Sequence, residues 1–459
     1  MLCTRAVISF LFAPLALLAG LAPLHGCGKQ GGSAPPAENA IVLLIDTVRF
    51  DEIGRRTAQG PVTPQIDRFS QGATRFQAAT AHAPWTLPSV ASLLTSAYPT
   101  VHGAVGLHPS FSKLRDAVPT GAEHLRSHGF ETGAFVNCAF LDPALGLDRG
   151  FDDYDYLPAS NRQLRRAPRT LDQALTWIDE RSGRYFLFVH LFDAHMDFDP
   201  PEPFLTQFLT DIPRPAEPPF GDVARWRREA PTAEMAAFAR ALYRAEIAAV
   251  DAAIGDFLDA LEQRGALANT AVVITSDHGE EFWEHGNFEH GHTLYDELLH
   301  VPLIVHAPGR DWEPTVEARV GLVDVLPTLC EVLGVPMNES FEGESLAPVA
   351  RGAETLSPYR FAESVLYGYE KKAAMDSRFK YIYQDKDRVS LMYDLVIDPL
   401  ERQSIAESDS TRRQLLASEL LQWFQRSLAR TEGSQRGEEV VDILEEDVVK
   451  KLRSLGYVN

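Results

Sequence analysis

Three uninterrupted hydrophobic runs of strand length lie far apart along the chain: Ala40–Ile45 (AIVLLI), Tyr185–Phe192 (YFLFVHLF) and Ala271–Ser276 (AVVITS). A strand that is hydrophobic at successive positions has both of its faces covered, which is typical of a parallel sheet between layers of helices. Helical patterns separate these runs at Pro64–Gln71, Ala117–His128, Thr170–Arg181 and Thr232–Arg264. The alternation predicts an α/β fold with a doubly wound, mostly parallel sheet.

The pattern changes after about residue 345. Short strand candidates follow, and then helical patterns: Arg360–Ser364, Phe379–Tyr383, Ser390–Asp394, Thr411–Thr431 and Glu445–Leu455. We therefore predict a main domain over residues 40–345 and a smaller α+β C-terminal subdomain over residues 346–459. The proline-rich segment Pro200–Pro219 predicts a loop or an irregular excursion.

The N-terminal residues 1–27 have the pattern of an export signal. Arg5 precedes an apolar run from Val7 to Leu24, and the run ends in Leu-His-Gly-Cys27, which resembles the end of a bacterial lipoprotein signal. Residues 28–39 are rich in Gly, Ser and Pro and predict a flexible tether. We expect an exported protein, lipid-anchored through Cys27 in the periplasm or at the outer membrane surface of a bacterial envelope. The alternative is an uncleaved membrane anchor.

The composition of the 459 residues narrows the function classes. The formal net charge of −21 argues against nucleic-acid binding, which requires a basic surface, and 45% hydrophobic residues indicate a globular chain. Four cysteines are too few for a disulfide scaffold. Cys138 and Cys330 lie in apolar segments and are predicted to be buried free thiols.

Acidic and histidine side chains follow each of the three hydrophobic runs. Asp46 follows the first, Asp193 and His195 the second, and Asp277 and His278 the third. Ligands of open α/β sheets bind beyond the carboxyl ends of the strands, so we expect these side chains to lie close together. Mixed oxygen and nitrogen donors indicate a metal centre.

A hydroxyl group is predicted at the start of a helix in Ala-Pro-Trp-Thr-Leu-Pro-Ser, residues 83–89. Pro88 suits the first turn of a helix over Leu87–Thr95, which places Thr86 at its N-terminus. Free N–H groups and the helix dipole stabilise an oxyanion there. A nearby metal would lower the pKa of this hydroxyl and make it a nucleophile.

The chain resembles the sulfatase-like branch of the alkaline phosphatase superfamily over nearly its whole mature length. The matching motifs are Leu-Ile-Asp-Thr-Val-Arg-Phe-Asp (44–51), Trp-Thr-Leu-Pro-Ser (85–89), Asp-Ala-His (193–195), Ser-Asp-His-Gly-Glu (276–280), His-Gly-His-Thr-Leu-Tyr-Asp-Glu (290–297), Val-Pro-Leu-Ile-Val (301–305) and Tyr-Asp-Leu-Val-Ile-Asp-Pro (393–399). The resemblance implies an alkaline-phosphatase-like fold and an enzyme that hydrolyses esters.

The resemblance also implies roles for individual residues. The metal ligands would be Asp46, Thr86, Asp277 and His278. Thr86 would also be the nucleophile, because it occupies the position at which sulfatases carry the Cys or Ser that matures to formylglycine. Ester oxygens or the leaving group would be contacted by His195, His290, His292 and Asp193, with His292 as the close alternative to His290.

Departures from the sulfatase pattern favour phosphoric esters over sulfuric esters. Thr86 cannot become formylglycine, Val90 replaces an Arg, and Thr47 replaces the second residue of an Asp-Asp pair. The second sulfatase signature aligns with residues 129–137 but lacks its Lys. A formylglycine hydrate can expel sulfate from its own adduct, whereas a Thr ester requires in-line displacement. Thr nucleophiles in this superfamily belong to phosphodiesterases and phosphotransferases.

The expected reaction is attack of Thr86 on phosphorus, with His195 or His290 protonating the leaving oxygen. His278 and Thr47 shift the expected cation toward zinc or manganese, with calcium as the alternative, and Asp193, His195 or His290 could hold a second ion. The substrate would be a small-molecule, lipid or glycan ester. The alternatives are a phosphotransferase that modifies an envelope lipid or glycan, and a non-catalytic binding protein with this fold.

Overall fold

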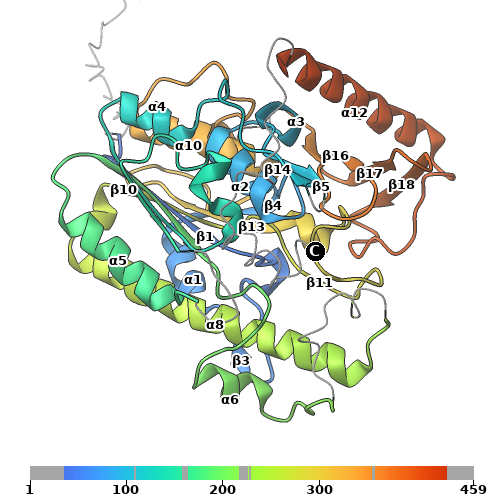
Figure 1. The fold of residues 1–459 in the computed structure, drawn as a ribbon, viewed down its shortest axis with the longest axis horizontal. Helices are drawn as coiled ribbons and strands as arrows, with labels where there is room; N and C mark the ends of the chain where they lie inside the picture. The colour runs from blue at the N-terminus through green and yellow to red at the C-terminus, as the bar shows by residue number, and fades with distance from the viewer. Residues whose placement is uncertain are drawn as a thin grey trace, which may run out of the picture. The chain divides into compact units, whose positions relative to one another are not determined.

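An eight-stranded sheet forms the centre of the computed structural model, which describes residues 36–107, 110–157, 164–216, 226, 229–353 and 357–431 (Figure 1). Its strand order is β14-β4-β13-β10-β1-β9-β7-β8. The strands are β1 (Asn39–Ile45), β4 (Thr74–Thr80), β7 (Glu131–Val136), β8 (Asp153–Tyr156), β9 (Tyr185–Leu191), β10 (Thr270–Thr275), β13 (His300–His306) and β14 (Thr315–Gly321). All neighbouring pairs are parallel except the two that involve β13. The predicted doubly wound, mostly parallel α/β sheet is confirmed, and β13 is the reversed strand.

Helices cover both faces of this sheet, as the continuous hydrophobic runs predict (Figure 1). Along β1, Val42 and Leu44 belong to one hydrophobic core, whereas Ile41 and Leu43 belong to the core on the opposite face. The first core contains residues of α2, α4 and α10, and the second contains residues of α1, α5 and α8. The helices are α1 (Pro64–Phe69), α2 (Thr86–Thr95), α3 (Pro99–His102), α4 (Gly121–Ser127), α5 (Ala167–Asp179), α6 (Phe204–Leu209), α8 (Ala233–Gln263), α9 (Asp296–Leu299), α10 (Val325–Leu333) and α11 (Ala347–Ala350).

Two helix boundaries differ from the predicted ones because of side chains that cap the helices. Helix α4 begins at Gly121 because Thr120 and Glu123 form a reciprocal capping box. Helix α5 begins at Ala167, whose N–H donates to both oxygens of Asp193. The prediction of a purely irregular segment at residues 200–219 was wrong, because it contains helix α6; residues 217–219 lie outside the described residues.

A second, antiparallel sheet follows the main sheet, in the order β15-β16-β17-β18, and packs against helix α12 (Ser410–Thr431). Its strands are β15 (Arg360–Ala362), β16 (Lys371–Met375), β17 (Phe379–Gln384) and β18 (Val389–Asp394). Trp423 of α12 stacks on Phe361 and meets Tyr98 edge-on, so α12 also contacts the segment that precedes α3. The predicted C-terminal strands and first helix are present, whereas the predicted helix Glu445–Leu455 lies outside the described residues.

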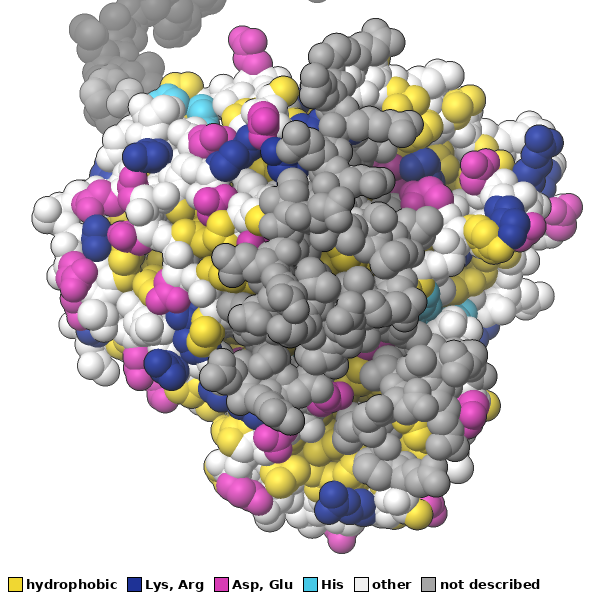
Figure 2. All heavy atoms as spheres, in the orientation of Figure 1, with side chains coloured by type: hydrophobic (Ala, Val, Ile, Leu, Met, Phe, Trp, Pro, Cys, Tyr) yellow, Lys and Arg dark blue, Asp and Glu magenta, His cyan; other side chains and the backbone are white. Residues whose placement is uncertain are grey.

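Three short hairpins complete the described strands: β2 (Arg56–Thr57) with β3 (Gly60–Pro61), β5 (Gly106–Leu107) with β6 (Ser110–Phe111), and β11 (Glu281–Phe282) with β12 (Phe288–Glu289). The structure contains Cys138 and Cys330 as buried free thiols, as predicted. Among the described residues, none of the helices has the length and apolar character that crossing a membrane requires. The predicted signal and residues 28–35 of the tether lie outside the described part of the chain. On the described surface that Figure 2 shows, acidic and basic side chains are interspersed with hydrophobic ones.

Candidate active site

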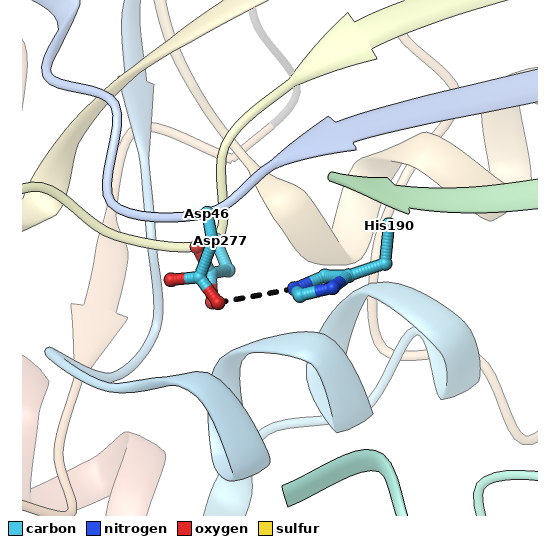
Figure 3. A group of neighbouring side chains, drawn as sticks. All are labelled: Asp46, His190 and Asp277. Atoms are coloured by element: carbon cyan, nitrogen blue, oxygen red, sulfur yellow. Dashed lines mark hydrogen bonds and ion pairs between the residues drawn. The ribbon is translucent and has the colours of Figure 1, made fainter. Parts of the chain in front are cut away.

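The carboxyl ends of β9, β1 and β10 bring the predicted ligands together. Strand β1 pairs in parallel with β9 on one side and β10 on the other, so the segments that follow these strands leave the sheet at one edge. Asp46 follows β1 directly, and its N–H donates to Leu191 O at the end of β9 (2.9 Å). Asp277 lies two residues beyond β10, and both carboxylates are fully buried. Figure 3 shows them side by side.

Each of these carboxylates has one oxygen held by N–H donors and one oxygen without a hydrogen-bond partner. Asp277 Oδ1 accepts from the N–H groups of His278 (3.0 Å) and Thr47 (3.3 Å). Asp46 Oδ2 lies 3.1 Å from His190 Nε2. Asp46 Oδ1 and Asp277 Oδ2 are buried and have no hydrogen-bond partner among the described residues. Because unpartnered buried carboxylate oxygens are energetically costly, this pattern indicates a place for a cation.

His278 presents its second ring nitrogen to the same point. His278 Nδ1 lies 2.9 Å from Gly279 O, and a carbonyl only accepts, so Nδ1 carries the proton. The lone pair of Nε2 then lies 3.7 Å from Asp46 Oδ1 and 3.4 Å from Asp277 Oδ2. A neutral histidine held in this tautomer by a carbonyl is typical of a metal ligand.

The Thr86 hydroxyl completes this group. Thr86 is the first residue of α2, and its Oγ1 lies 3.4 Å from His278 Nε2. Ser89 of the same helix donates its hydroxyl to Asp277 O (2.6 Å), which fixes the helix against the end of β10. The structure thus brings together Asp46, Thr86, Asp277 and His278. Two carboxylate oxygens, one imidazole nitrogen and one hydroxyl fit a divalent cation.

His190 is the residue of this site that sequence reasoning missed. It is fully buried in β9, and together with Asp46 and Asp277 it forms a group whose ligand atoms lie within 4.8 Å of one another (Figure 3). The only feature of the sequence that could have identified His190 as a site residue is that a histidine interrupts an otherwise hydrophobic strand. The structure shows that His190 pairs with Leu44 of β1. Asp46 lies two residues beyond Leu44, on the same face of the sheet, and the sequence alone does not reveal this register.

Two further histidines surround the group. The ring of His290 lies 4.4 Å from that of His278 and 5.1 Å from that of His195, measured between centroids. His290 Nδ1 lies 3.0 Å from Glu280 Oε1, and both residues are buried. His195 stacks on Phe192, and its Nδ1 donates to Met196 O (2.5 Å). These contacts hold both imidazoles beside the carboxylates.

The other two predicted contacts have different partners. His292 Nε2 lies 2.8 Å from Glu281 Oε2, and its Nδ1 lies 3.1 Å from His290 O. Asp193 accepts two hydrogen bonds from the first N–H of α5. A second group of three candidate ligands in the described residues, Glu281, His285 and Glu297, is held together by its own hydrogen bonds.

Comparisons with known proteins identify the family of this chain. The family model "Sulfatase" matches residues 38–335, and the model "N-sulphoglucosamine sulphohydrolase, C-terminal" matches residues 283–426. The chain belongs to the sulfatase family. Arylsulfatase K of Xenopus laevis is 34% identical over 180 residues, which are 36% of this chain and 33% of that protein. Human arylsulfatase K is 25% identical over 401 residues, covering 72% of this chain and 69% of that protein. The chain thus spans about a third of the first of these relatives.

Solved structures share the fold of this sulfatase-family chain. The 2-O GAG sulfatase BT1596 has a TM-score of 0.71 at 20% identity, covering 87% of this chain and 94% of that one. A phosphonate monoester hydrolase of Agrobacterium radiobacter has a TM-score of 0.70 at 22% identity, covering 86% and 96%. At this identity the likeness concerns the fold. It confirms the predicted alkaline-phosphatase-like architecture.

Thr47, which departs from the sulfatase pattern, and Asn137, in the stretch that lacks the expected Lys, have clear contacts in the structure. The Thr47 hydroxyl donates to Ala194 O (3.0 Å), and its backbone has a φ of 61°. Asn137, at the end of the stretch that lacks the expected Lys, lies between His190 O and the guanidinium of Arg165. Both side chains therefore fix the loops that carry the site.

A neutral thiol also borders the site. Burial and the charge of Asp46 raise the pKa of Cys138 well above its ordinary value, and its hydrogen bond with Thr86 opposes the rise. The sequence contains no motif that relates Cys138 to Thr86. Their proximity follows from the packing of the segment after β7 against α2.

The two buried carboxyls of the candidate metal site, Asp46 and Asp277, have different proton affinities. Burial raises the pKa of Asp46, but its hydrogen bond with His190 and the other nearby histidines lower this pKa by more than burial raises it, so it lies below its ordinary value. Burial and the neighbouring charge of Asp46 raise the pKa of Asp277 to about 6. Asp277 is therefore the carboxyl at which a proton would compete with a bound cation below neutral pH.

A buried glutamate on α8 gives a pH-dependent prediction outside this group. Glu246 accepts from Asp199 N (2.7 Å) and Arg166 Nη1 (2.8 Å), and burial raises its pKa from 4.5 to about 8. Since the folded pKa exceeds the unfolded one, this group stabilises the folded state relatively more in acid, and that contribution is lost as the pH rises toward 8. In wild type, the unfolding free energy should fall between about pH 5 and 8 because Glu246 loses its proton. In Glu246→Gln, we expect this fall to be smaller than in wild type by on the order of 2 kcal/mol.

Denaturant unfolding at both pH values measures this difference. The control is Glu262→Gln, which changes an exposed glutamate of the same helix. An unchanged slope in Glu246→Gln would contradict the assignment of the pH dependence to this residue.

Proposed function

We propose that this sulfatase-family protein is a metal-dependent hydrolase that cleaves phosphoric esters with Thr86 as its nucleophile. The observation that carries the proposal is the position of Thr86 Oγ1, at the N-terminus of α2 and 3.4 Å from His278 Nε2, beside two unpartnered carboxylate oxygens. Membership of the sulfatase family supports the coarser part of the proposal, that the chain is a hydrolase of esters.

A divalent cation fits the residues that are present. Asp46 and Asp277 supply oxygens without hydrogen-bond partners, His278 supplies an unprotonated nitrogen, and Thr86 supplies a hydroxyl. Such a cation would lower the pKa of the hydroxyl and neutralise charge on the ester oxygens. With one imidazole in the set, zinc or manganese is favoured over calcium.

Groups of the protein itself then have separate roles in the reaction. The Thr86 hydroxyl releases its proton to solvent, and the bond from Thr86 Oγ1 to phosphorus forms while the bond from phosphorus to the leaving oxygen breaks. The N–H groups at the start of α2 stabilise negative charge on the phosphoryl oxygens. His195 or His290 gives a proton to the leaving oxygen, and water later cleaves the phospho-Thr bond. Glu280 orients His290 for that transfer.

The nucleophile decides between the two ester classes. A Thr ester has no geminal hydroxyl and cannot expel sulfate as a formylglycine hydrate does, so the phosphoric class is favoured. Sulfuric esters are the second candidate, because the relatives in the family are named arylsulfatases. The structural neighbours include a sulfatase and a phosphonate monoester hydrolase, so this fold is compatible with ester hydrolysis at sulfur and at phosphorus.

The test compares nitrophenyl sulfate, nitrophenyl phosphate and bis-nitrophenyl phosphate as substrates, with Zn²⁺, Mn²⁺ or Ca²⁺ added back after chelation. We expect turnover of a phosphoric ester that chelation abolishes and Zn²⁺ or Mn²⁺ restores. Turnover of the sulfate alone would contradict the argument from Thr86. Metal binding without turnover of any ester would favour a phosphotransferase that requires its own acceptor, or a binding protein.

We further propose that the substrate is a small-molecule, lipid or glycan ester encountered in the bacterial envelope. This proposal depends on the lipoprotein signal predicted in residues 1–27, which lie outside the described residues. The zinc or manganese preference and the envelope location are independent of each other.

A further inference from the structure

His190 lies on the face of β9 that is directed toward α2. Its parallel partner in β1 is Leu44, and Asp46 lies two residues beyond Leu44 on the same face. The residues on the same face, Phe186 and Phe188 of β9 and Phe192 just beyond the strand, belong to the hydrophobic core. Burying an imidazole among these side chains costs free energy unless one of its nitrogens makes a hydrogen bond.

The polar contact of His190 is with one oxygen of Asp46. His190 Nε2 lies 3.1 Å from Asp46 Oδ2, and the dashed line in Figure 3 marks this contact. The other oxygen, Asp46 Oδ1, is the one without a hydrogen-bond partner, and it lies 3.7 Å from His278 Nε2. The contact with His190 therefore fixes which oxygen of Asp46 is directed toward His278 and Asp277.

The two histidines beside Asp46 differ at their second ring nitrogens. His278 donates Nδ1–H to Gly279 O, as metal-ligating histidines commonly donate theirs to a carbonyl or a carboxylate. His190 Nδ1 is buried and has no hydrogen-bond partner in the part of the chain that the structure describes. A proton on Nδ1 would have no acceptor there, so the proton belongs on Nε2, where Asp46 Oδ2 accepts it.

We infer that His190 is a positioning residue of the metal centre: its Nε2–H holds Asp46 Oδ2, so that Asp46 Oδ1 is presented to the cation. This inference rests on the proposed metal site. It assigns one imidazole ligand, His278, and one imidazole donor, His190. It also explains why β9 carries a histidine among phenylalanines.

The test measures Zn²⁺ affinity of the full chain by calorimetric titration, after chelation, for wild type, His190→Leu and His190→Gln. The leucine variant keeps the volume approximately but removes the donor, and we expect it to bind Zn²⁺ about 10–100-fold more weakly. The glutamine variant keeps an N–H donor, and we expect its affinity to be close to that of wild type. Melting in the presence of chelator shows whether each variant folds.

X-ray absorption at the zinc edge provides a second readout, which His190→Gln supplies even if His190→Leu does not fold. We expect one imidazole ligand both in wild type and in His190→Gln. Two imidazole ligands in wild type, or unchanged affinity in His190→Leu, would overturn the inference. Absence of Zn²⁺ binding by wild type would overturn it together with the metal site. Zn²⁺ binding without ester turnover would overturn only the proposed function, because neither readout depends on turnover.

Discussion

Replacing Thr86 with alanine is expected to lower phosphoester turnover by roughly 10³-fold or more, because the variant lacks the atom that forms the bond to phosphorus. Zn²⁺ affinity should fall far less, since Asp46, Asp277 and His278 retain their ligand atoms. The variant should also fold, because the hydrogen bonds of the Thr86 hydroxyl within the described part of the chain are with His278 and Cys138, which are neighbours in the site itself. Steady-state kinetics with bis-nitrophenyl phosphate and titration with Zn²⁺ measure the two effects separately.

The same helix provides the matched control. Thr95, at the other end of α2, is buried and donates its hydroxyl to Ala91 O (2.6 Å), so Thr95→Ala removes an identical group away from the site. We expect Thr95→Ala to retain turnover and Thr86→Ser to retain a measurable part of it. Full activity in Thr86→Ala would exclude Thr86 as the nucleophile. Capture of a phosphorylated Thr86 after rapid quenching of wild type would identify the intermediate directly.

The parts of the site that could be predicted from the sequence lie at the ends of elements. Asp46, Asp277 and His278 follow hydrophobic strands, and the carboxyl ends of adjacent parallel strands meet at one edge of the sheet. Thr86 lies two residues before Pro88, and a proline is typical of the first turn of a helix. In the structure, α2 begins at Thr86. In each case a local pattern determines the position of the side chain before any long-range contact is known.

The parts that could not be predicted depend on register and on packing between distant segments. His190 lies within a hydrophobic run, and whether it faces Asp46 depends on the pairing of β9 with β1. The contact between His290 and Glu280 depends on how the loop after β12 folds back. The reversed direction of β13 was not predicted, because a hydrophobic run has the same composition in either direction.

The C-terminal sheet holds the loop that carries His290 and His292 by contacts that no local pattern indicates. Lys371 Nζ donates to His292 O (2.8 Å), and Lys380 Nζ donates to Leu294 O (3.2 Å). Lys380 is fully buried in β17 and pairs with Asp296 at 2.5 Å and Glu401 at 3.0 Å. The C-terminal sheet thus connects its own core to the loop beside the metal-binding group.

Replacing Lys380 with methionine is therefore expected to be the most destabilising of the substitutions considered. The variant removes the ammonium group that lies within 3.0 Å of both Asp296 and the buried Glu401, and loss of one partner of a buried ion pair typically costs about 3–5 kcal/mol. In wild type, Lys380 holds the pKa of Asp296 well below its ordinary value; without it both carboxyls bind protons more readily. The destabilisation should consequently be smaller near pH 5 than near pH 8, which denaturant unfolding at the two pH values measures.

Two companion variants separate the charge effect from a loss of packing. Lys386→Met changes an exposed lysine just beyond the same strand, and we expect it to change the unfolding free energy by less than about 0.5 kcal/mol. Adding Asp296→Asn to Lys380→Met should recover part of the lost stability, because one of the two unpaired charges is removed. Equal destabilisation at both pH values, without recovery in the double variant, would show that packing around the Lys380 stem dominates. Where Lys380→Met remains folded, we expect turnover to fall more than Zn²⁺ affinity, because the loop of His290 loses its support whereas Asp46, Asp277 and His278 do not.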